Sequence, residues 1–415
     1  METKKISVGY RFSKRDESEY FVDEEFVNEN PDCWEIIKFL SENPFTTQKE
    51  ICEKFNFSKD ELIEKNKKIR EADWTRNYII SAGTGSKYWK NTIIPTIESG
   101  KAKSVLDEKY AYPDRVGLCP GLSCNFFCSF CGRNYSAAYE KELGEKGFEM
   151  FKQIIDQTPK EVNKKKVYHI TGGLEPLAFP RIGDLISYGE KAGFTMEMQT
   201  SGFFLTPDFI EKHPGIKDLS ILRISLYGVD NDSTFEVTKN KKAYDVVKEN
   251  LINYLKLDTK TKLGLNYVIL HKRTKDILKL LDYIEEINIK SNNQVDFLTL
   301  REDFAEEAEN ILGEERQEIY NIFNEVQKRL ESKNLNKLHI DYGYALESIR
   351  KNQNSYQRGL EKVDYKQLRP KAFPQIAVMV DPKGDVFAYH EATFLDREGA
   401  KRYSIGRVDK EHSME

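Results

Sequence analysis

The 415-residue chain has few of the features that mark several large protein classes. It contains 6 cysteines, 3 tryptophans and 13 prolines, and its basic and acidic residues nearly balance, at 64 and 68. So few cysteines exclude a disulfide scaffold, and the balanced charge gives no sign of nucleic-acid binding. No apolar run is long enough for a membrane-spanning helix, and the N-terminal segment lacks the apolar stretch of a secretory signal. We therefore expect a soluble, cytoplasmic protein with no nucleic-acid or membrane partner.

The cysteines that are present are clustered. Four of them lie between residues 119 and 131, and Cys124, Cys128 and Cys131 have the spacing CX3CX2C. Three thiolates can hold three irons of a [4Fe–4S] cluster and leave the fourth iron open. The alternatives are a zinc site completed by Cys119 or a histidine, a reactive dithiol at CSFC, and unligated core cysteines. A zinc ribbon usually needs two CxxC pairs, and only one occurs here.

The first part of the chain, residues 1–110, reads as a mostly helical N-terminal extension. Apolar positions at helical spacing occur in residues 33–41, and Ser58 with Glu61 forms a capping box for a later helix. Apolar residues at alternate positions near the N-terminus, Ile6, Val8 and Tyr10, indicate a possible strand. Three short helices with small loops are therefore expected before a linker.

From residue 111 the pattern changes to short apolar runs that alternate with helical segments. The runs are residues 116–119, 167–171, 194–201, 221–228, 262–270 and 295–300. This repetition predicts a parallel sheet with helices outside it, in an α/β fold. Six units favour a partial (β/α)6 TIM-like barrel over residues 111–310, with active groups at the carboxyl ends of its strands. A C-terminal α/β region over 311–415 is expected to contain a β-hairpin at 376–389, turned by DPKG.

Two further segments surround the cysteine motif in this scheme. Thr171-Gly172-Gly173-Leu174-Glu175-Pro176 follows the second strand, where glycines let the backbone approach a ligand and Glu175 could hold an ammonium group. Arg223 and Ser225 alternate on the fourth strand and therefore face the same side. An arginine inside a barrel needs an anion or a neighbouring acid, since an unpaired buried charge is costly.

These features together resemble the radical SAM superfamily. The resemblance implies that the fourth iron chelates S-adenosyl-L-methionine, which yields a 5′-deoxyadenosyl radical after one-electron reduction. It implies cluster ligation by Cys124, Cys128 and Cys131, and leaves Cys119 as a core thiol at a strand end. The cofactor-binding residues that it implies are Gly172, Gly173, Glu175, Ser201, Arg223 and Ser225.

A closer resemblance covers residues 88–408. Among its segments are YWKNTIIP, VGLCPGLSCNFFCSFCGR, TGGLEPL, RISLYG, NYVIL, VDFLTLREDF, LHIDYGYAL, IAVMVDPKGDVFAYHEATF and GAKRYSIGRV. They are similar to the radical SAM ammonia-lyases of desosamine biosynthesis, apart from Cys119 and His390. That family acts on TDP-4-amino-4,6-dideoxy-D-glucose. The resemblance implies abstraction of the carbon-3 hydrogen, loss of ammonia and a 3-keto-4,6-dideoxy product, with flavodoxin or ferredoxin as a small electron-transfer partner.

The catalytic residues are expected at strand ends and near the hairpin. Arg301 and Asp303 follow the sixth strand and would share one side if the strand extends that far. Asp341 and Tyr342 come from the strand-like run that follows the sixth strand, where an aromatic core is the commoner interpretation of tyrosine. Glu391 follows the hairpin.

Two other functions remain open. Residues 1–75 are reminiscent of a leader-peptide-binding winged domain, which would fit a radical SAM peptide-maturing enzyme. Such enzymes often add a cysteine-rich auxiliary cluster, but residues 132–415 contain no cysteine. The second is a non-enzymatic iron–sulfur or zinc sensor, which the six barrel-like strands and the GGLEP segment disfavour.

Overall fold

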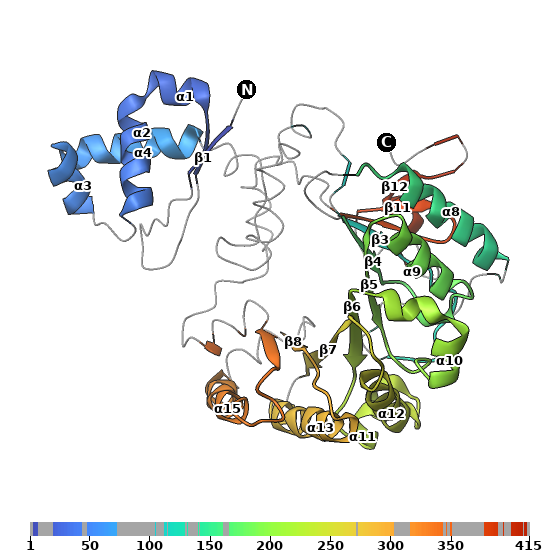
Figure 1. Ribbon diagram of the computed structural model, residues 1–415. Helices are drawn as coiled ribbons and strands as arrows, with labels where there is room; N and C mark the ends of the chain where they lie inside the picture. The colour runs from blue at the N-terminus through green and yellow to red at the C-terminus, as the bar shows by residue number, and fades with distance from the viewer. Residues whose placement is uncertain are drawn as a thin grey trace. The chain divides into compact units, whose positions relative to one another are not determined.

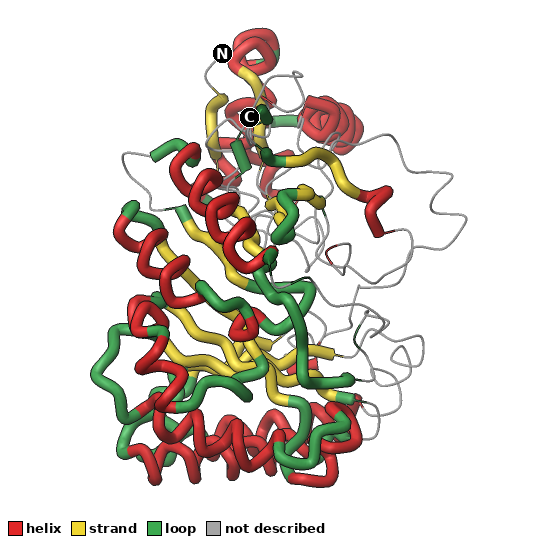
Figure 2. Tube along the Cα trace, turned by 90° about the vertical axis from the view of Figure 1, so that its right-hand side faces the viewer, coloured by secondary structure: helices red, strands yellow, loops and turns green. Residues whose placement is uncertain are grey.

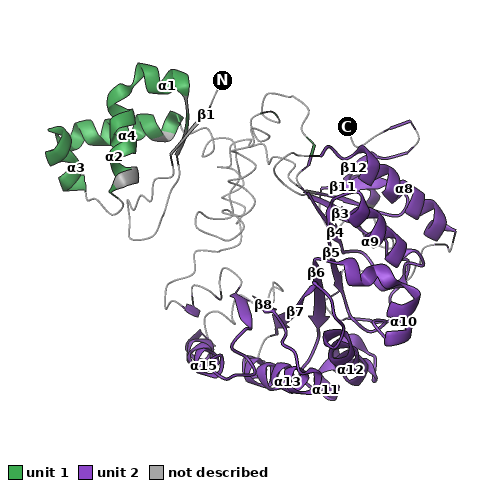
Figure 3. Ribbon diagram, in the orientation of Figure 1, with its two compact units in different colours: residues 1–112, 359–376 green, residues 113–358, 377–415 purple. Residues whose placement is uncertain are grey.

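The computed structural model divides into two compact units, coloured separately in Figure 3. Unit 1 comprises residues 1–112 and 359–376, and unit 2 comprises residues 113–358 and 377–415. The residues that the structure describes are 3–6, 20–43, 48–72, 104, 112–113, 115–128, 131, 140, 142–160, 166–270, 273–302, 316–342, 346, 349–350, 377–388, 393, 400–409 and 411–412.

Unit 1 combines a small antiparallel sheet with short helices. Strand β1 (Thr3–Ile6) pairs with β2 (Tyr20–Asp23). The helices are α1 (Glu24–Glu29), α2 (Pro31–Glu42), α3 (Gln48–Phe55) and α4 (Lys59–Ala72). Their apolar faces meet in one core that includes Ile36, Ile51 and Leu62. The predicted capping box is confirmed, because the Ser58 N–H donates to Glu61 Oε2 at 2.7 Å and the Glu61 N–H donates to Ser58 Oγ at 3.2 Å.

Unit 2 is built on one curved sheet. In the described part of the chain its strands follow the order β12-β11-β10-β3-β4-β5-β6-β7-β8-β9. The central strands are β3 (Arg115–Leu118), β4 (Val167–Ile170), β5 (Thr195–Thr200), β6 (Ile221–Leu226), β7 (Lys262–Ile269), β8 (Phe297–Glu302) and β9 (His339–Tyr342). Each of these pairs in parallel with the next. The parallel sheet predicted from the six apolar runs is confirmed, in the form of an open, partial barrel.

Helices connect the strands and cover the convex side of the sheet (Figures 1 and 2). The α-helices are α8 (Leu143–Gln157), α9 (Ile182–Lys191), α10 (Pro207–Lys212), α11 (Asn231–Thr238), α12 (Ala243–Leu255), α13 (Asp276–Ser291) and α15 (Arg316–Arg329). Short 3₁₀ turns are η2 (Pro176–Ala178), η3 (Pro214–Asp218) and η5 (Ala400–Tyr403). Among the described helices none is both long and apolar enough to cross a membrane.

The two faces of the sheet differ in chemistry. On β4, Tyr168 is buried, and its hydroxyl contacts Thr158 at the end of α8. On β6, alternate residues are buried in the same way, while Arg223 and Ser225 on the other face are only half-buried. Because neighbouring strands pair in parallel, side chains in register share a face. The concave face therefore carries polar side chains, and the convex face provides the helix-covered core.

The C-terminal strands extend the same sheet. Strand β10 (Ala377–Val380) pairs in parallel with β3 and antiparallel with β11 (Asp385–Phe387). Strand β12 (Ser404–Arg407) then pairs antiparallel with β11. The predicted hairpin is confirmed, and Gly384 in its turn has a φ of 87°, which favours glycine. Strand β9 lies at one edge of the sheet and β12 at the other, so both edges come from residues beyond 310.

Candidate active site

The three cysteines of the CX3CX2C motif lie together after the carboxyl end of β3. Cys128 is buried, and the partly buried Cys124 and Cys131 pack against the same small apolar cluster. The Cys131 N–H donates to the Cys128 carbonyl at 3.0 Å, and the Phe126 N–H lies 3.5 Å from Cys124 Sγ. This local folding groups the three sulfur-bearing side chains predicted to bind the cluster.

Aromatic side chains from neighbouring strand ends cover the cysteine loop. Phe126 is buried, and its ring meets those of Phe203 and Tyr227 edge-on, with both centroid distances at 5.6 Å. Phe203 follows β5 and Tyr227 follows β6, so the loop is packed against the next strands of the barrel. These rings keep water away from the interior side of the cysteines.

Burial favours the protonated form of the Cys128 thiol in the absence of a metal ion. Burial, followed by the neighbouring sulfurs of Cys124 and Cys131, raises the pKa of the Cys128 thiol to about 12. A metal ion reverses this preference, because a coordinating thiol is deprotonated. Within the described residues no group of three His, Cys, Asp or Glu side chains could hold a single metal ion. Three thiolates that each bind a different iron suit a [4Fe–4S] cluster with one open iron.

The glycine-rich segment after β4 packs directly on the cysteine loop. The Glu175 N–H donates to the Ser123 carbonyl at 3.0 Å. A side chain at Gly121 would place its Cβ 2.6 Å from the Leu174 carbonyl oxygen, so only glycine permits this approach. Gly172 and Gly173 both have positive φ, 86° and 63°. The predicted cofactor segment and the predicted cluster loop are therefore adjacent.

The Glu175 carboxylate is buried and receives four hydrogen bonds from the protein. Its Oε1 accepts from the Leu177 N–H at 3.0 Å and from the Thr200 hydroxyl. Its Oε2 accepts from the Ser201 N–H at 2.9 Å and from Ser201 Oγ at 2.6 Å. Two carboxylate oxygens offer about four acceptor positions. These donors fill them, so Glu175 ties the loop after β4 to the loop after β5.

Arg223 and Ser225 project from β6 onto the concave face, as their alternation predicts. Ser225 Oγ accepts from Gln199 Nε2 at 3.2 Å. Burial lowers the pKa of Arg223, and Glu197 is the largest influence in the opposite direction. The Arg223 guanidinium lies 5.3 Å from the ring centroid of Phe297, and its Nε is buried without a hydrogen-bond partner. A guanidinium in this state can accept an anionic ligand.

Other orphaned polar atoms lie near the same strand ends. Both amide atoms of Asn125, which follows the first cluster cysteine, are buried without a hydrogen-bond partner. The same is true of Oδ1 of Asn266, which pairs with Ser225 across β6 and β7. Buried polar groups in folded proteins are nearly always hydrogen-bonded. Unsatisfied atoms here fit the binding of a polar molecule such as S-adenosylmethionine beside the cysteines.

The predicted catalytic residues are only partly within the described chain. Arg301 lies in β8 with an exposed side chain, whereas Asp303 and Glu391 lie outside the described residues. Asp341 on β9 pairs with Thr299 of β8, which places it on the face that carries Arg223. Tyr342 packs against Phe323 of α15 with ring centroids 4.8 Å apart, in line with the aromatic-core interpretation.

A polar chain on the concave face was missed by the sequence analysis. An Arg115 Nη lies 2.5 Å from His169 Nε2, and His169 Nδ1 lies 3.3 Å from a carboxylate oxygen of Glu197. Burial, followed by the arginines Arg115 and Arg223, lowers the pKa of His169 to about 3. The neutral imidazole then accepts from Arg115 through Nε2, and its Nδ1 lies beside the Glu197 carboxylate. Alternation along the predicted strands was the signal that could have placed His169 and Glu197 on this face.

Cys119, the remaining cysteine between residues 119 and 131, lies in the core at the end of β3. It is 2% exposed, and its N–H donates to the Val380 carbonyl at 2.9 Å. Burial raises the pKa of its thiol to about 12. The prediction of a core thiol at the strand end is confirmed.

The fold and the cysteine loop together define a radical SAM enzyme. Residues 118–284 match the model of the radical SAM superfamily. The chain belongs to this superfamily, whose members contain a [4Fe–4S] cluster and use S-adenosylmethionine.

Two relatives of known function are similar to the chain. It is 35% identical over 341 residues to the dTDP-4-amino-4,6-dideoxy-D-glucose ammonia-lyase of Streptomyces venezuelae, covering 81% of this chain and 69% of that protein. It is 30% identical over 90 residues to a tungsten-containing aldehyde ferredoxin oxidoreductase cofactor-modifying protein of Pyrococcus furiosus, covering 21% of this chain and 24% of that protein. The enzyme is therefore homologous to an ammonia-lyase.

Some solved structures of low sequence identity are similar to the chain. Streptococcus suis SuiB bound to the precursor peptide SuiA is 13% identical, with a TM-score of 0.48 and coverage of 92% of this chain and 76% of that one. The protein anSMEcpe with bound AdoMet is 15% identical, with a TM-score of 0.43 and coverage of 71% and 77%. Since both TM-scores lie below 0.5, the fold assignment rests on the strand order given above.

Proposed function

We propose that this enzyme removes ammonia from a nucleotide-activated 4-amino-4,6-dideoxy sugar, TDP-4-amino-4,6-dideoxyglucose, and forms a 3-keto-4,6-dideoxy sugar. The observation that carries the proposal is the 35% identity to an ammonia-lyase across 81% of the chain. The buried three-cysteine loop beside a glycine-rich segment supports it, because this reaction needs both a cluster and a cofactor site.

Within this proposal Cys124, Cys128 and Cys131 hold the cluster. The cofactor site is formed by Gly172, Gly173, Ser201, Arg223 and Ser225, with Glu175 as the group that positions two of its loops. When bound, the cluster and S-adenosylmethionine supply a carbon radical that can remove a hydrogen atom from the substrate. Arg223 is suited to the cofactor's carboxylate, since it lies on the concave face with a buried, unpartnered Nε.

The chemistry in the sugar balances without an added oxidant. Carbon 3 loses its C–H hydrogen and its hydroxyl proton and becomes a ketone. Carbon 4 loses ammonia and gains one proton and one electron, the electron coming from the small carrier that reduces the cluster, so the sugar product has the oxidation level of its precursor. The reaction requires a group that accepts the hydroxyl proton and groups that hold the leaving amine. Arg301, Asp303 and Glu391 are proposed for these substrate roles.

The test is an anaerobic assay of the reconstituted enzyme with the sugar deuterated at carbon 3. Ammonia and the 3-keto sugar should appear together, and deuterium should appear in 5′-deoxyadenosine. Cys128→Ala should lose iron and all of these products, and this variant is the matched control for the wild type. Release of ammonia with deuterium retained at carbon 3 would contradict the mechanism. Cleavage of S-adenosylmethionine with a peptide and with no amino sugar would favour a peptide-maturing enzyme.

A further inference from the structure

The cysteine loop presents one large apolar side chain to solvent. Phe126 and Phe127 are adjacent between Cys124 and Cys128, but they face opposite environments. Phe126 is 2% exposed within the aromatic cluster, whereas Phe127 is 51% exposed. Phe127 is bonded directly to Cys128, so an apolar contact point on the surface lies next to a predicted cluster ligand.

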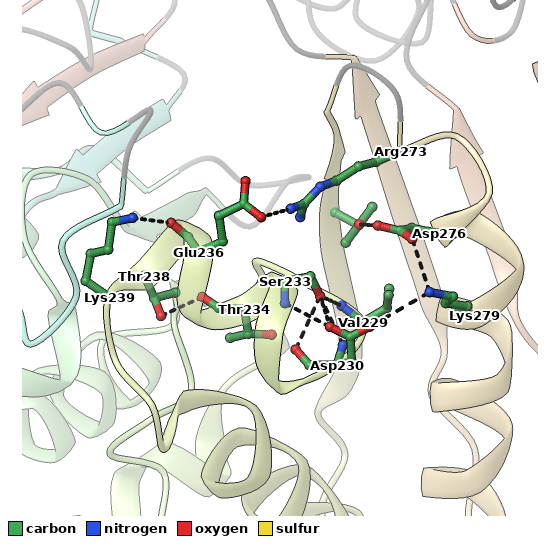
Figure 4. Close-up of polar contacts among 11 residues, drawn as sticks. Val229, Asp230, Ser233, Thr234, Glu236, Thr238, Lys239, Arg273, Asp276 and Lys279 are labelled. Carbon is green, nitrogen blue, oxygen red and sulfur yellow. Dashed lines mark hydrogen bonds and ion pairs between the residues drawn. The ribbon is translucent and has the colours of Figure 1, made fainter.

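This contact point is fixed to the end of α11. The Phe127 N–H donates to the Thr238 carbonyl at 2.8 Å. Thr238 is buried, and its hydroxyl donates to the Thr234 carbonyl at 2.7 Å, which holds the last turn of the helix (Figure 4). Phe235, one turn earlier on α11, is 38% exposed. The exposed Phe127 is thus held next to a well-defined helix end rather than to a separate loop.

The segment that follows α11 is basic. Lys239, Lys241 and Lys242 are all exposed, and Lys241 Nζ lies 5.8 Å from the ring centroid of Phe235. Nearby carboxylates do not cancel this charge, because Glu236 forms an ion pair with Arg273. Asp245, on the next helix, accepts hydrogen bonds from Asn231. Around this helix end the three lysines therefore form no ion pair with the described residues, and the Glu236 carboxylate is paired with Arg273.

Figure 4 shows the polar contacts of Lys239, Glu236 and Arg273 at the end of α11. Lys239 donates to the Glu236 carbonyl at 2.8 Å, and the Glu236 carboxylate reaches Arg273 on the same side of the helix. At the other end of α11, Asp230 caps the helix through Ser233 and is approached by Lys279 at 3.8 Å. Glu236 is paired with Arg273, and Lys239, Lys241 and Lys242, which form no ion pair with the described residues, lie at the end of α11 that contacts the cysteine loop.

We propose that Phe127, Phe235, Lys239, Lys241 and Lys242 form the docking surface for the protein that reduces the cluster. The partner is a small one-electron carrier with an acidic face around its exposed redox group. This inference rests on the proposed function, because it assumes a cluster that must receive single electrons. An apolar centre with a basic rim matches such a partner. Electron-transfer complexes bury little area, and their encounters depend on charge complementarity.

The test compares charge reversal on this surface with charge reversal elsewhere. The variant is Lys241→Glu/Lys242→Glu, and the matched control is Lys212→Glu/Lys217→Glu. The control lysines are exposed and precede β6, so they lie toward the amino ends of the parallel strands, whereas the cysteine loop follows a carboxyl end. Each protein is mixed anaerobically with reduced flavodoxin, and bleaching of the cluster absorbance is followed by stopped flow at low and high salt.

We expect Lys241→Glu/Lys242→Glu to lower the second-order rate of reduction by at least about 10-fold at low salt, with the difference shrinking as salt is added. The control should change by less than about twofold. Binding of oxidised flavodoxin, measured by calorimetry on iron-free protein, should weaken in the same variant alone. A wild-type reduction rate and wild-type binding in this variant would overturn the proposal.

A chemical reductant separates this inference from the proposed function. With dithionite, which needs no protein docking surface, the variant should be reduced as fast as the wild type and should melt at the same temperature. An equal loss with dithionite would show that the lysines support the structure and would overturn the docking assignment. Failure of the wild type to release ammonia, with reduction by flavodoxin still dependent on the lysines, would count against the substrate alone.

Discussion

Replacing Glu175 with glutamine should destabilise the enzyme, because both oxygens of the carboxylate act only as hydrogen-bond acceptors. A glutamine amide must place its –NH2 group where either Oε1 or Oε2 now lies. On either side it meets one hydroxyl and one backbone N–H, from Leu177 at 3.0 Å or from Ser201 at 2.9 Å. The hydroxyl can rotate and accept, but the backbone N–H cannot. One buried N–H therefore loses its acceptor, at a cost of about 1–3 kcal/mol.

Urea unfolding of the iron-free protein measures this cost without the cofactor. With a slope of about 3 kcal/mol per molar urea, the midpoint should fall by about 0.3–1 M. Glu211→Gln, at an exposed position on α10, is the control and should leave the midpoint unchanged. Binding of S-adenosylmethionine should weaken together with stability, since the loops after β4 and β5 are no longer joined. Normal stability with lost cofactor binding would refute this reasoning and make Glu175 a direct ligand.

Other predictions follow from buried titratable groups. Burial, and then Asp385, raises the pKa of Asp381 from 3.8 to about 6, so its contribution opposes folding increasingly as pH rises from about 4 to 6. Above pH 6, Asp381→Asn should therefore raise the free energy of unfolding by at most about 3 kcal/mol and shift the urea midpoint upward. An unchanged urea midpoint at pH 8 would contradict this. The pKa of His169 is lowered from 6.5 to about 3, so the unfolded chain alone takes up a proton as pH falls through this window. Stability should decline there, and His169→Gln should flatten that part of the pH profile of the urea midpoint. Cys119→Ala should retain iron, measured by elemental analysis, because this buried thiol is not required for the cluster.

The sequence predicted most of what depends on local pattern. Alternating runs located the strands from β3 to β8, and period-two alternation placed Arg223 and Ser225 on one face. The prediction that Cys124, Cys128 and Cys131 lie together required no tertiary information, since all three are in one short segment. The turn chemistry of DPKG likewise predicted the hairpin that contains Gly384.

Contacts between distant segments could not be predicted in the same way. The hydrogen bonds that Glu175 receives from Thr200 and Ser201, at the end of the following strand, could not be predicted from the sequence. The Arg115–His169–Glu197 chain needs the register of three strands, which alternation within each strand does not give. Such contacts depend on how neighbouring strands align, and that alignment is set by the packing of the whole sheet.

The pairing of β10 with β3 has a consequence for the order of events during synthesis. Strand β3 leads into the cysteine loop, and the first loop residue, Cys119, hydrogen-bonds to Val380 of β10. Because the ribosome makes β3 long before β10, this edge of β3 has no native partner until β10 emerges. Native pairing between such distant segments is slow to form. The cysteine loop therefore reaches its final support only after β10 has been made and has paired with β3.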